Sequence, residues 1–140
     1  MRYLLTLIFT LGFIAPASAQ EPPGLFSTYT DYEDYLVSAA KDRRFGEMLV
    51  RLGGGDEYTP EQVAQLQAQL DNIFPRDFDR DDLVVRDPIG NGYFHEIRTV
   101  YRAGTLQYLF IYCLLHQRDD ALIVLNFAFN TSAQPIFGRL

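Results

Sequence analysis

The chain has 140 residues, a net charge of −6 at pH 7, 48% hydrophobic residues and 21% charged residues. This composition can support a folded core, and an acidic chain without a basic cluster excludes a nucleic-acid-binding surface. One cysteine and two histidines exclude an internal disulfide framework and a thiolate zinc cluster. We therefore expect no cofactor and no nucleic-acid partner.

The N-terminal residues 1–19 have the pattern of a secretion signal. Arg2 supplies a positive charge, residues 3–14 form an apolar run, and residues 17–19 read Ala-Ser-Ala, an A-x-A cleavage site. A membrane-spanning helix needs roughly 20 apolar residues, so the apolar run is too short for an anchor. We expect cleavage after Ala19 and a periplasmic or secreted protein with no membrane span left after cleavage.

The segment after the signal predicts an arm and then a helix that breaks. Residues 20–27 contain two prolines and a glycine and predict an irregular arm, and residues 28–140 are expected to form a single domain. Thr30 and Glu33 form a capping box that predicts the start of a first helix. Its apolar stripe changes sides near residues 41–44, which predicts a break or kink there.

A second helix is expected over residues 60–74. Thr59 and Gln62 form a capping box, Pro60 occupies the first helical position, and Pro75 ends the helix. From residue 81 the apolar period changes to two, which predicts strands at residues 83–86, 93–102, 106–116 and 121–130. The predicted class is α+β, with N-terminal helices packed on one face of a four-stranded curved antiparallel sheet.

Turn positions predict which side chains share a face of this sheet. A two-residue turn at Ala103-Gly104 and a reversal at residues 117–120 would pair His95 with Tyr112, and Tyr112 with Leu125. The resulting aromatic face, expected to meet the helices, contains Tyr93, His95, Ile97, Tyr101, Tyr108, Phe110, Tyr112, Leu114, Ile123, Leu125, Phe127 and Phe129. The opposite, mixed face contains Phe94, Glu96, Arg98, Val100, Gln107, Leu109, Ile111, Cys113, Val124, Asn126, Ala128 and Asn130.

Helices followed by an antiparallel sheet that closes with LNFAFNT at residues 125–131 resemble the cystatin-like, nuclear-transport-factor-like roll. This superfamily includes ketosteroid isomerase and polyketide cyclases, as well as small secreted bacterial domains of unknown function. The resemblance implies a cone-shaped pocket between the helices and the sheet, and a dimer through the outer sheet face. Enzymes of the superfamily use an acid or a His/Asp pair in the cone, whereas the aromatic face here offers His95 and tyrosines without a carboxylate.

The candidate ligand pocket is therefore aromatic, and His95 is the candidate catalytic residue. A histidine beside tyrosines can act as a general base or bind a ligand, although such a histidine is more often a core residue satisfied by a hydroxyl group. The residues expected to line the pocket are Tyr93, His95, Tyr108, Phe110, Tyr112 and Phe127.

Two further features have mainly structural interpretations. Asp77, Asp79 and Asp81 match the first ligand positions of a calcium loop, but the glycine and the final glutamate of such a loop are missing, so only a weak cation site is conceivable. Cys113 lies within an apolar strand and is expected to be a small buried residue rather than a nucleophile.

The function expected from the sequence is a non-enzymatic binding or interaction module that binds a small apolar ligand or a partner protein. The alternative is an isomerase or cyclase that uses His95. An apolar centre with a polar rim on the mixed face also predicts a homodimer through Val100, Leu109, Ile111 and Val124. The sequence specifies neither the ligand nor the partner.

The signal sequence generates the first testable prediction. The exported protein should begin at Gln20, because the A-x-A site ends at Ala19. Intact-mass measurement of protein recovered from the extracytoplasmic fraction tests this expectation. A mass that retains residues 3–14 would contradict it.

Overall fold

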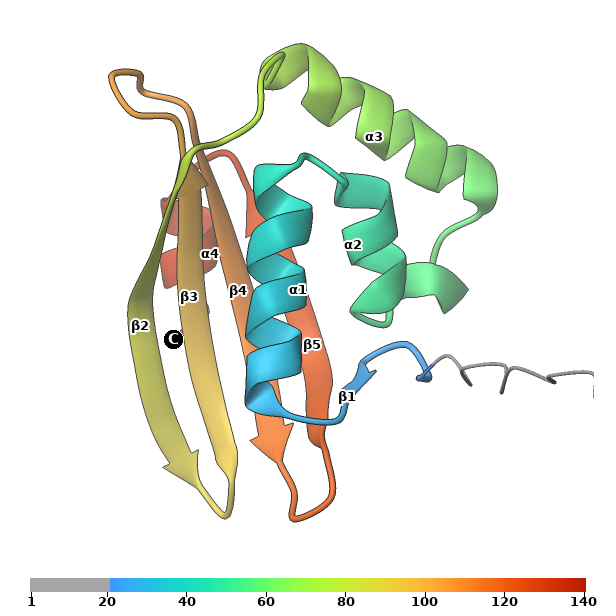
Figure 1. Cartoon of the computed structure of the whole chain (residues 1–140), viewed down its shortest axis with the longest axis vertical. Coiled ribbons are helices and arrows are strands. Elements are labelled where there is room, and N and C mark those ends of the chain that lie inside the picture. Colours follow the sequence, from blue (N-terminus) through green and yellow to red (C-terminus); the bar gives the residue numbers. More distant parts are fainter. Residues whose placement is uncertain (1–20) are drawn as a thin grey trace, which may run out of the picture.

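The computed structural model describes residues 21–140, so the predicted signal sequence lies outside the described residues. The fold is α+β, with an open, five-stranded antiparallel sheet in the order β1-β5-β4-β3-β2 (Figure 1). The elements in chain order are β1 (Leu25–Phe26), α1 (Tyr29–Lys41), α2 (Phe45–Arg51), the 3-10 helix η1 (Gly54–Asp56), α3 (Pro60–Ile73), β2 (Arg80–Gly90), β3 (Tyr93–Tyr101), β4 (Tyr108–Gln117), β5 (Leu122–Asn130) and α4 (Gln134–Phe137).

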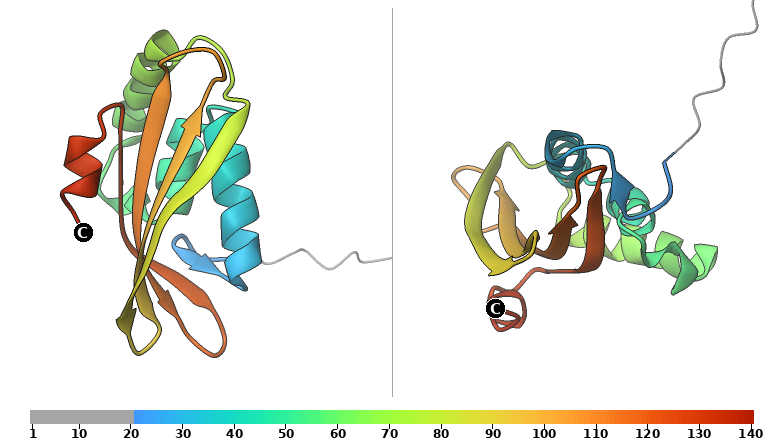
Figure 2. Two further views of the ribbon diagram at one scale, coloured as in Figure 1. Left: turned by 90° about the vertical axis from the view of Figure 1, so that its left-hand side faces the viewer. Right: turned by 90° about the horizontal axis from the view of Figure 1, so that it is seen from below.

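The predicted α+β class is confirmed, the predicted number of strands is wrong, and the predicted packing of the N-terminal helices on one face holds only in part. The fifth strand, β1, lies in the segment that was expected to be irregular. Helix α1 lies on one face of the sheet and the short helix α4 lies on the other (Figure 2). Helices α2 and α3 continue from α1 toward and past the β5 side of the sheet (Figure 1).

Strand β1 is held in place by Arg51. The Arg51 guanidinium donates hydrogen bonds to the carbonyl oxygens of Leu25 at 2.8 Å and Pro22 at 3.2 Å. It also lies 3.8 Å from the centroid of the Phe26 ring. These contacts fix β1 where it pairs antiparallel with the start of β5, through Leu25 and Ile123.

The break between α1 and α2 confirms the prediction for residues 41–44. Arg43 has a φ of 59°, in the left-handed region, and α2 begins two residues later. The predicted N-cap of α1 is wrong, because Thr28 rather than Thr30 caps it. The Thr28 side chain accepts a hydrogen bond from the backbone N–H of Asp31 at 3.0 Å, which satisfies a donor of the first turn.

Helix α3 begins where the sequence predicts, but little of its surface is buried against the rest of the protein. Thr59 and Gln62 form the reciprocal capping box, with hydrogen bonds of 3.2 Å and 2.9 Å. Helix α3 approaches α2 closely at Gly46, where a Cβ atom would lie 2.9 Å from Val63 Cγ1. Of the α3 residues only Leu70 is buried. Most of the surface of α3 is therefore accessible.

The β3–β4 pairing confirms which of their side chains share a face, although the register is shifted. His95 pairs with Leu114 and Ile97 pairs with Tyr112, whereas the prediction paired His95 with Tyr112. The connection is longer than a two-residue turn, since Arg102 donates its N–H to the carbonyl of Gln107. A shift of two residues leaves every side chain on its predicted face.

The predicted parity is wrong for residues 126–130 of β5. Tyr112 pairs with Ala128 instead of Leu125, and Phe127 pairs with Cys113. The hairpin closes between Arg118 and Ala121, and a register shift at Leu114/Leu115 inserts Leu125 as an extra residue of β5, so Ile123 and Val124 before it keep their predicted faces. Beyond the inserted residue the shift is odd, which moves the following side chains to the other face. Phe110 and Phe127 consequently lie on opposite faces of the sheet.

The helices pack on the mixed face and not on the aromatic face. This correction removes the predicted homodimer surface, because its four residues belong to the core with exposed fractions of 1%, 0%, 1% and 9% for Val100, Leu109, Ile111 and Val124. Branched, medium-sized side chains give this face a continuous apolar centre for the helices. The aromatic residues of β3 and β4 are on the outer face, where α4 places Ile136 against Ile97 and Tyr112.

The polar residues of the mixed face form a buried charged cluster with α1. Glu96 and Arg98, exposed to 1% and 4%, pair through Arg98 Nε and Glu96 Oε1 at 2.5 Å. Tyr29 donates to Glu96 at 2.8 Å and accepts from Arg98 at 2.7 Å, and Arg98 also pairs with Glu33. Burial, reinforced by the hydrogen bond to Glu96, raises the pKa of Tyr29 to about 12. Tyr29 is thus a neutral donor at ordinary pH.

The cluster generates a stability prediction. Glu96→Gln should lower the free energy of unfolding by about 3 kcal/mol, because it leaves the buried Arg98 charge without its buried counter-ion and with only the partly exposed Glu33. Urea unfolding followed by circular dichroism measures this loss.

Asp120→Asn is the matched control for Glu96→Gln. It removes an acid from the Arg118–Asp120 pair, whose side chains are 51% and 69% exposed. The control should change stability by no more than about 0.5 kcal/mol. Equal effects of the two substitutions would contradict a special role for the buried cluster.

Candidate functional site

The six predicted pocket residues do not converge on one cavity. Five of them lie on the outer face of β3 and β4, the face that α4 covers at Ile97 and Tyr112. These five are Tyr93, His95, Tyr108, Phe110 and Tyr112. Phe127 lies on the helix-facing side, where it packs against the main core. The reversed parity of β5 is the physical reason for this separation.

The proposed catalytic histidine has one side-chain partner in the described structure. His95 Nδ1 lies 2.7 Å from the Tyr112 hydroxyl, and burial raises the pKa of Tyr112. The register places Asp87 of β2 opposite His95, but no hydrogen bond joins them within residues 21–140. The His95–Tyr112 pair therefore has the geometry of two polar groups that satisfy each other.

The remaining outer-face aromatic residues form cross-strand stacks. Tyr93 stacks on His116 with ring centroids 3.9 Å apart, and Tyr108 stacks between Tyr101 and Phe110 at 5.0 Å and 5.9 Å. Such stacks stabilise a sheet through paired apolar area. They bury ring faces against one another rather than around a cavity.

The acidic run from Asp77 to Asp81 is divided among different partners. Asp77 accepts from Arg43 at 2.8 Å, Asp79 from the Ala103 N–H at 2.9 Å, and Asp81 from Lys41 at 3.1 Å. Within residues 21–140 no group of three or more His, Cys, Asp or Glu side chains is arranged to hold a metal ion.

The cysteine is buried and protonated. Burial raises the pKa of the Cys113 thiol to about 12, and the residue is 1% exposed. A thiol in this environment is a poor nucleophile.

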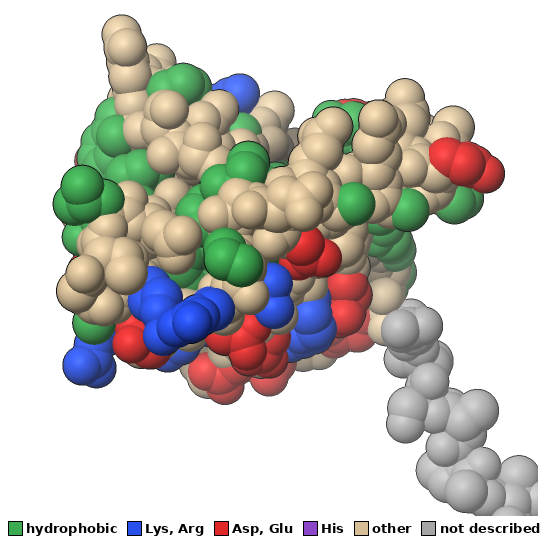
Figure 3. Space-filling model, turned by 90° about the horizontal axis from the view of Figure 1, so that it is seen from above, with side chains coloured by type: hydrophobic (Ala, Val, Ile, Leu, Met, Phe, Trp, Pro, Cys, Tyr) green, Lys and Arg blue, Asp and Glu red, His purple; other side chains and the backbone are tan. Residues whose placement is uncertain are grey.

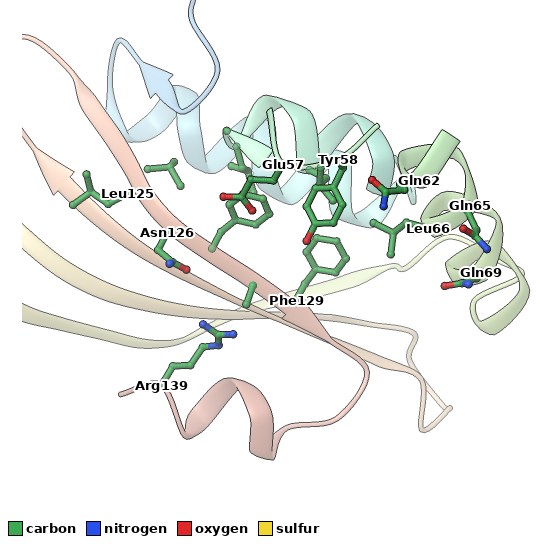
Figure 4. A pocket seen from close by; sticks show the side chains of 16 residues that line it. Glu57, Tyr58, Gln62, Gln65, Leu66, Gln69, Leu125, Asn126, Phe129 and Arg139 are labelled. Atoms are coloured by element: carbon green, nitrogen blue, oxygen red, sulfur yellow. The ribbon is translucent and has the colours of Figure 1, made fainter. Parts of the chain in front are cut away.

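A groove of about 580 Å³ lies between β5 and the segment that runs from α2 to α3 (Figure 4). Its lining combines apolar side chains with polar ones, among them the glutamine amides along α3. The lining residues are Leu49, Leu52, Gly53, Glu57, Tyr58, Gln62, Gln65, Leu66, Gln69, Val124, Leu125, Asn126, Phe127, Ala128, Phe129 and Arg139. Phe127 is the one predicted pocket residue among them.

The groove includes both sides of the β5 edge. Tyr58 and Phe129 point toward each other on the helix side, and Arg139 approaches from the other side of β5, after α4 (Figure 4). Phe127 and Phe129 stack at 6.4 Å and pack against the core. Gly54 permits this arrangement, because a Cβ atom there would lie 3.0 Å from the end of the Phe127 ring.

The β5 edge beside the groove is open. Strand β1 pairs only with Leu122 and Ile123, and Val124 donates its N–H to Gly24. Within residues 21–140 no backbone hydrogen bond reaches this edge at residues 125–130. An edge strand with unpaired N–H and C=O groups is a template for another strand.

The other edge of the sheet is protected. Strand β2 carries charged residues along its length, contains Pro88, and shows register shifts at Leu83/Val85 and Pro88/Gly90. These are features that prevent edge-to-edge pairing. Strand β5 contains no charged residue and no proline. The two edges are thus built differently, and only the β5 edge is suited to accept a strand.

The surface of α3 beside this edge is poor in charge. Seen from the end of the molecule where α3 lies, charged side chains gather along one side, whereas α3 itself is mostly uncharged except near its outer tip (Figure 3). The sequence of α3 contains two acidic residues and no basic residue. A docking segment would therefore meet few competing charges on this helix.

The sequence interpretation missed the groove, although two signals for it are present. Residues 126–130 read Asn-Phe-Ala-Phe-Asn, with aromatic residues at every second position and no charge, and the exposed positions of α3 carry Gln62, Gln65 and Gln69. Together they describe an uncharged edge strand facing an uncharged polar helix.

Comparison of the chain with protein-family models, curated proteins and solved structures finds no match. Within residues 21–140, no helix has the length and apolarity required to cross a bilayer. The functional argument therefore starts from the groove and the open edge.

The His95–Tyr112 pair generates a prediction that separates the two functions expected from the sequence. His95→Gln should lower the free energy of unfolding by about 1 kcal/mol through the altered hydrogen bond, and should leave binding at the groove unchanged. Tyr112→Phe, which removes the same bond from the other side, is the matched variant. Thermal unfolding and a binding assay on both proteins test this; loss of binding without loss of stability would assign His95 a functional role.

Proposed function

We propose that the protein is an exported, non-enzymatic interaction module that binds an extended segment of a partner polypeptide as an added strand on β5. The helix packed on an antiparallel sheet is compatible with the cystatin-like, nuclear-transport-factor-like roll, and we infer membership of that group. The observation that carries the proposal is the open β5 edge beside a groove of about 580 Å³ that is lined by both apolar and amide side chains.

A bound segment would gain two kinds of interaction. Its backbone would pair with the free edge at residues 125–130, in line with β1. Alternate side chains would enter the groove against Leu66, Phe127 and Phe129, while the glutamine amides along α3 would hydrogen-bond polar groups. Main-chain bonds give affinity and side-chain pockets give selectivity in strand addition.

A polypeptide fits the site better than a small apolar molecule. The groove is open along a strand edge, and that edge supplies backbone donors and acceptors at a regular spacing. A small apolar ligand leaves such groups unpaired, whereas an extended peptide satisfies them. The alternative function, an isomerase or cyclase, relies on His95, which does not line the groove.

The test uses acetyl-Thr-Val-Gln-Val-Thr-Val-amide, labelled with fluorescein, and the purified protein. We expect saturable binding by fluorescence anisotropy and slower hydrogen exchange of the amides of residues 125–130. Leu125→Lys should weaken binding about tenfold, because it removes an apolar contact of about 1.4 kcal/mol and places a charge on the edge. Leu125 is 47% exposed, so the substitution should preserve the fold.

Leu106→Lys is the matched control, since Leu106 is 96% exposed and lies in the connection between β3 and β4. It should bind the peptide as the wild type does. A second peptide with proline in place of each valine lacks those backbone donors and should not bind. Absence of saturable binding by the valine peptide, together with unchanged exchange at residues 125–130, would overturn the proposed function.

A further inference from the structure

Two charged residues border the β5 edge on opposite faces of the sheet. Arg139 follows α4 on the outer face, and its guanidinium carbon lies 5.7 Å from the centroid of the Tyr112 ring. Tyr112 pairs with Ala128, so Arg139 lies beside the middle of the open edge. Glu57 follows η1 on the helix side, where Gly54 meets Phe127. Both residues line the groove.

These two charges have no counter-ion in the described structure. Within residues 21–140 the salt bridges include Arg43, Arg44, Arg51, Arg98 and Arg118, but none includes Arg139 or Glu57. Arg139 faces the groove across the edge of β5 (Figure 4). A cation at this position is available to a bound segment.

We propose that the segment accepted by β5 alternates apolar and acidic residues, with apolar side chains toward α3 and an acidic side chain toward Arg139. The inference rests on the proposed function, and it follows from the geometry of an added strand. Successive side chains of a strand point to opposite faces of the sheet. One set therefore meets Leu66, Phe127 and Phe129, and the other set meets Arg139.

The position of Glu57 supports the same assignment of sides. An acidic side chain on the helix side would approach Glu57 and would have to leave water beside Leu66 and Phe129. Both effects oppose binding, by like-charge repulsion and by desolvation. The acidic residue is therefore selected for the outer face and the apolar residues for the inner face.

The charges also disfavour a second copy of this chain as the occupant. Two β5 strands paired antiparallel are related by a two-fold axis perpendicular to the sheet, so each face of one copy continues into the same face of the other. The pairing would bring Arg139 toward Arg139 of the partner subunit on one face. It would also bring Glu57 toward its counterpart on the other face. A partner polypeptide with an acidic residue avoids both contacts.

The test compares three labelled peptides that differ at one position. They are acetyl-Thr-Val-Glu-Val-Thr-Val-amide and the same peptide with lysine or glutamine in place of glutamate. We expect the glutamate peptide to bind about fivefold more tightly than the glutamine peptide, and the lysine peptide more weakly, as a partly exposed ion pair would give. Sedimentation velocity on each sample reports whether the protein is monomeric.

Arg139→Glu should reverse the order of the two charged peptides, so that the lysine peptide binds more tightly than the glutamate peptide. Arg76→Glu is the matched control, because Arg76 is exposed and does not line the groove. It should keep the wild-type order. Circular dichroism of both variants confirms that they fold.

The outcomes separate this inference from the proposed function. If the glutamine peptide binds but the glutamate and lysine peptides bind equally, or if Arg139→Glu leaves their order unchanged, the acidic preference is wrong and strand addition stands. If no peptide binds, strand addition itself fails. If the protein is a dimer that Leu125→Lys converts to a monomer, the occupant is a second copy and the inference is overturned.

Discussion

The buried pair of Glu96 and Arg98 fixes the position of α1, and the rest of the helical layer follows from it. Apolar contacts tolerate small sliding movements, but a charged pair inside a core is stable only where its hydrogen bonds are complete. Tyr29 and Glu33 complete them from α1. Helix α2 follows α1 after the left-handed turn at Arg43, and α3 then packs on Gly46. The helical wall of the groove is therefore positioned by the charged pair on β3, through α1, α2 and α3 in turn.

The two edges of the sheet differ in such a way that another strand can pair with the β5 edge but not with the β2 edge. Strand β2 is long and exposed, but its charges, its proline and its register shifts oppose pairing. Strand β5 has no charge and no proline along its open residues, its one register shift lies at Leu125, and β1 covers only its start. An open apolar edge is a risk for aggregation unless a partner uses it. The overhanging helix α3 limits that risk by restricting how another chain can approach the edge.

The parts of the fold that depend on local signals could be predicted from the sequence. The capping box at Thr59, the break near Arg43 and the period-two pattern of the strands each involve residues close together in the chain. The α+β class follows from their order. These features do not depend on distant contacts, so composition and spacing were sufficient.

The candidate site depended on distant contacts and could not be predicted in the same way. One inserted residue at the β4–β5 ladder moved Phe127 away from His95 and Tyr112, and no turn residue signals such a shift. Glu96 and Arg98 were predicted on the mixed face, opposite the face expected to meet the helices, and only their contacts with α1 make their burial possible. The helix-facing side was consequently assigned to the wrong set of side chains.

The sheet topology has a consequence for the order of folding. Strands β2 to β5 pair with their neighbours in sequence, so these hairpins close short loops. Strand β1 pairs with β5 across roughly a hundred residues, and the entropy lost on closing a loop grows with its length. Until this long loop closes, the whole β5 edge, including Leu122 and Ile123, is unpaired. The folding chain is therefore most exposed to mispairing after the hairpins form and before Arg51 holds β1 in place.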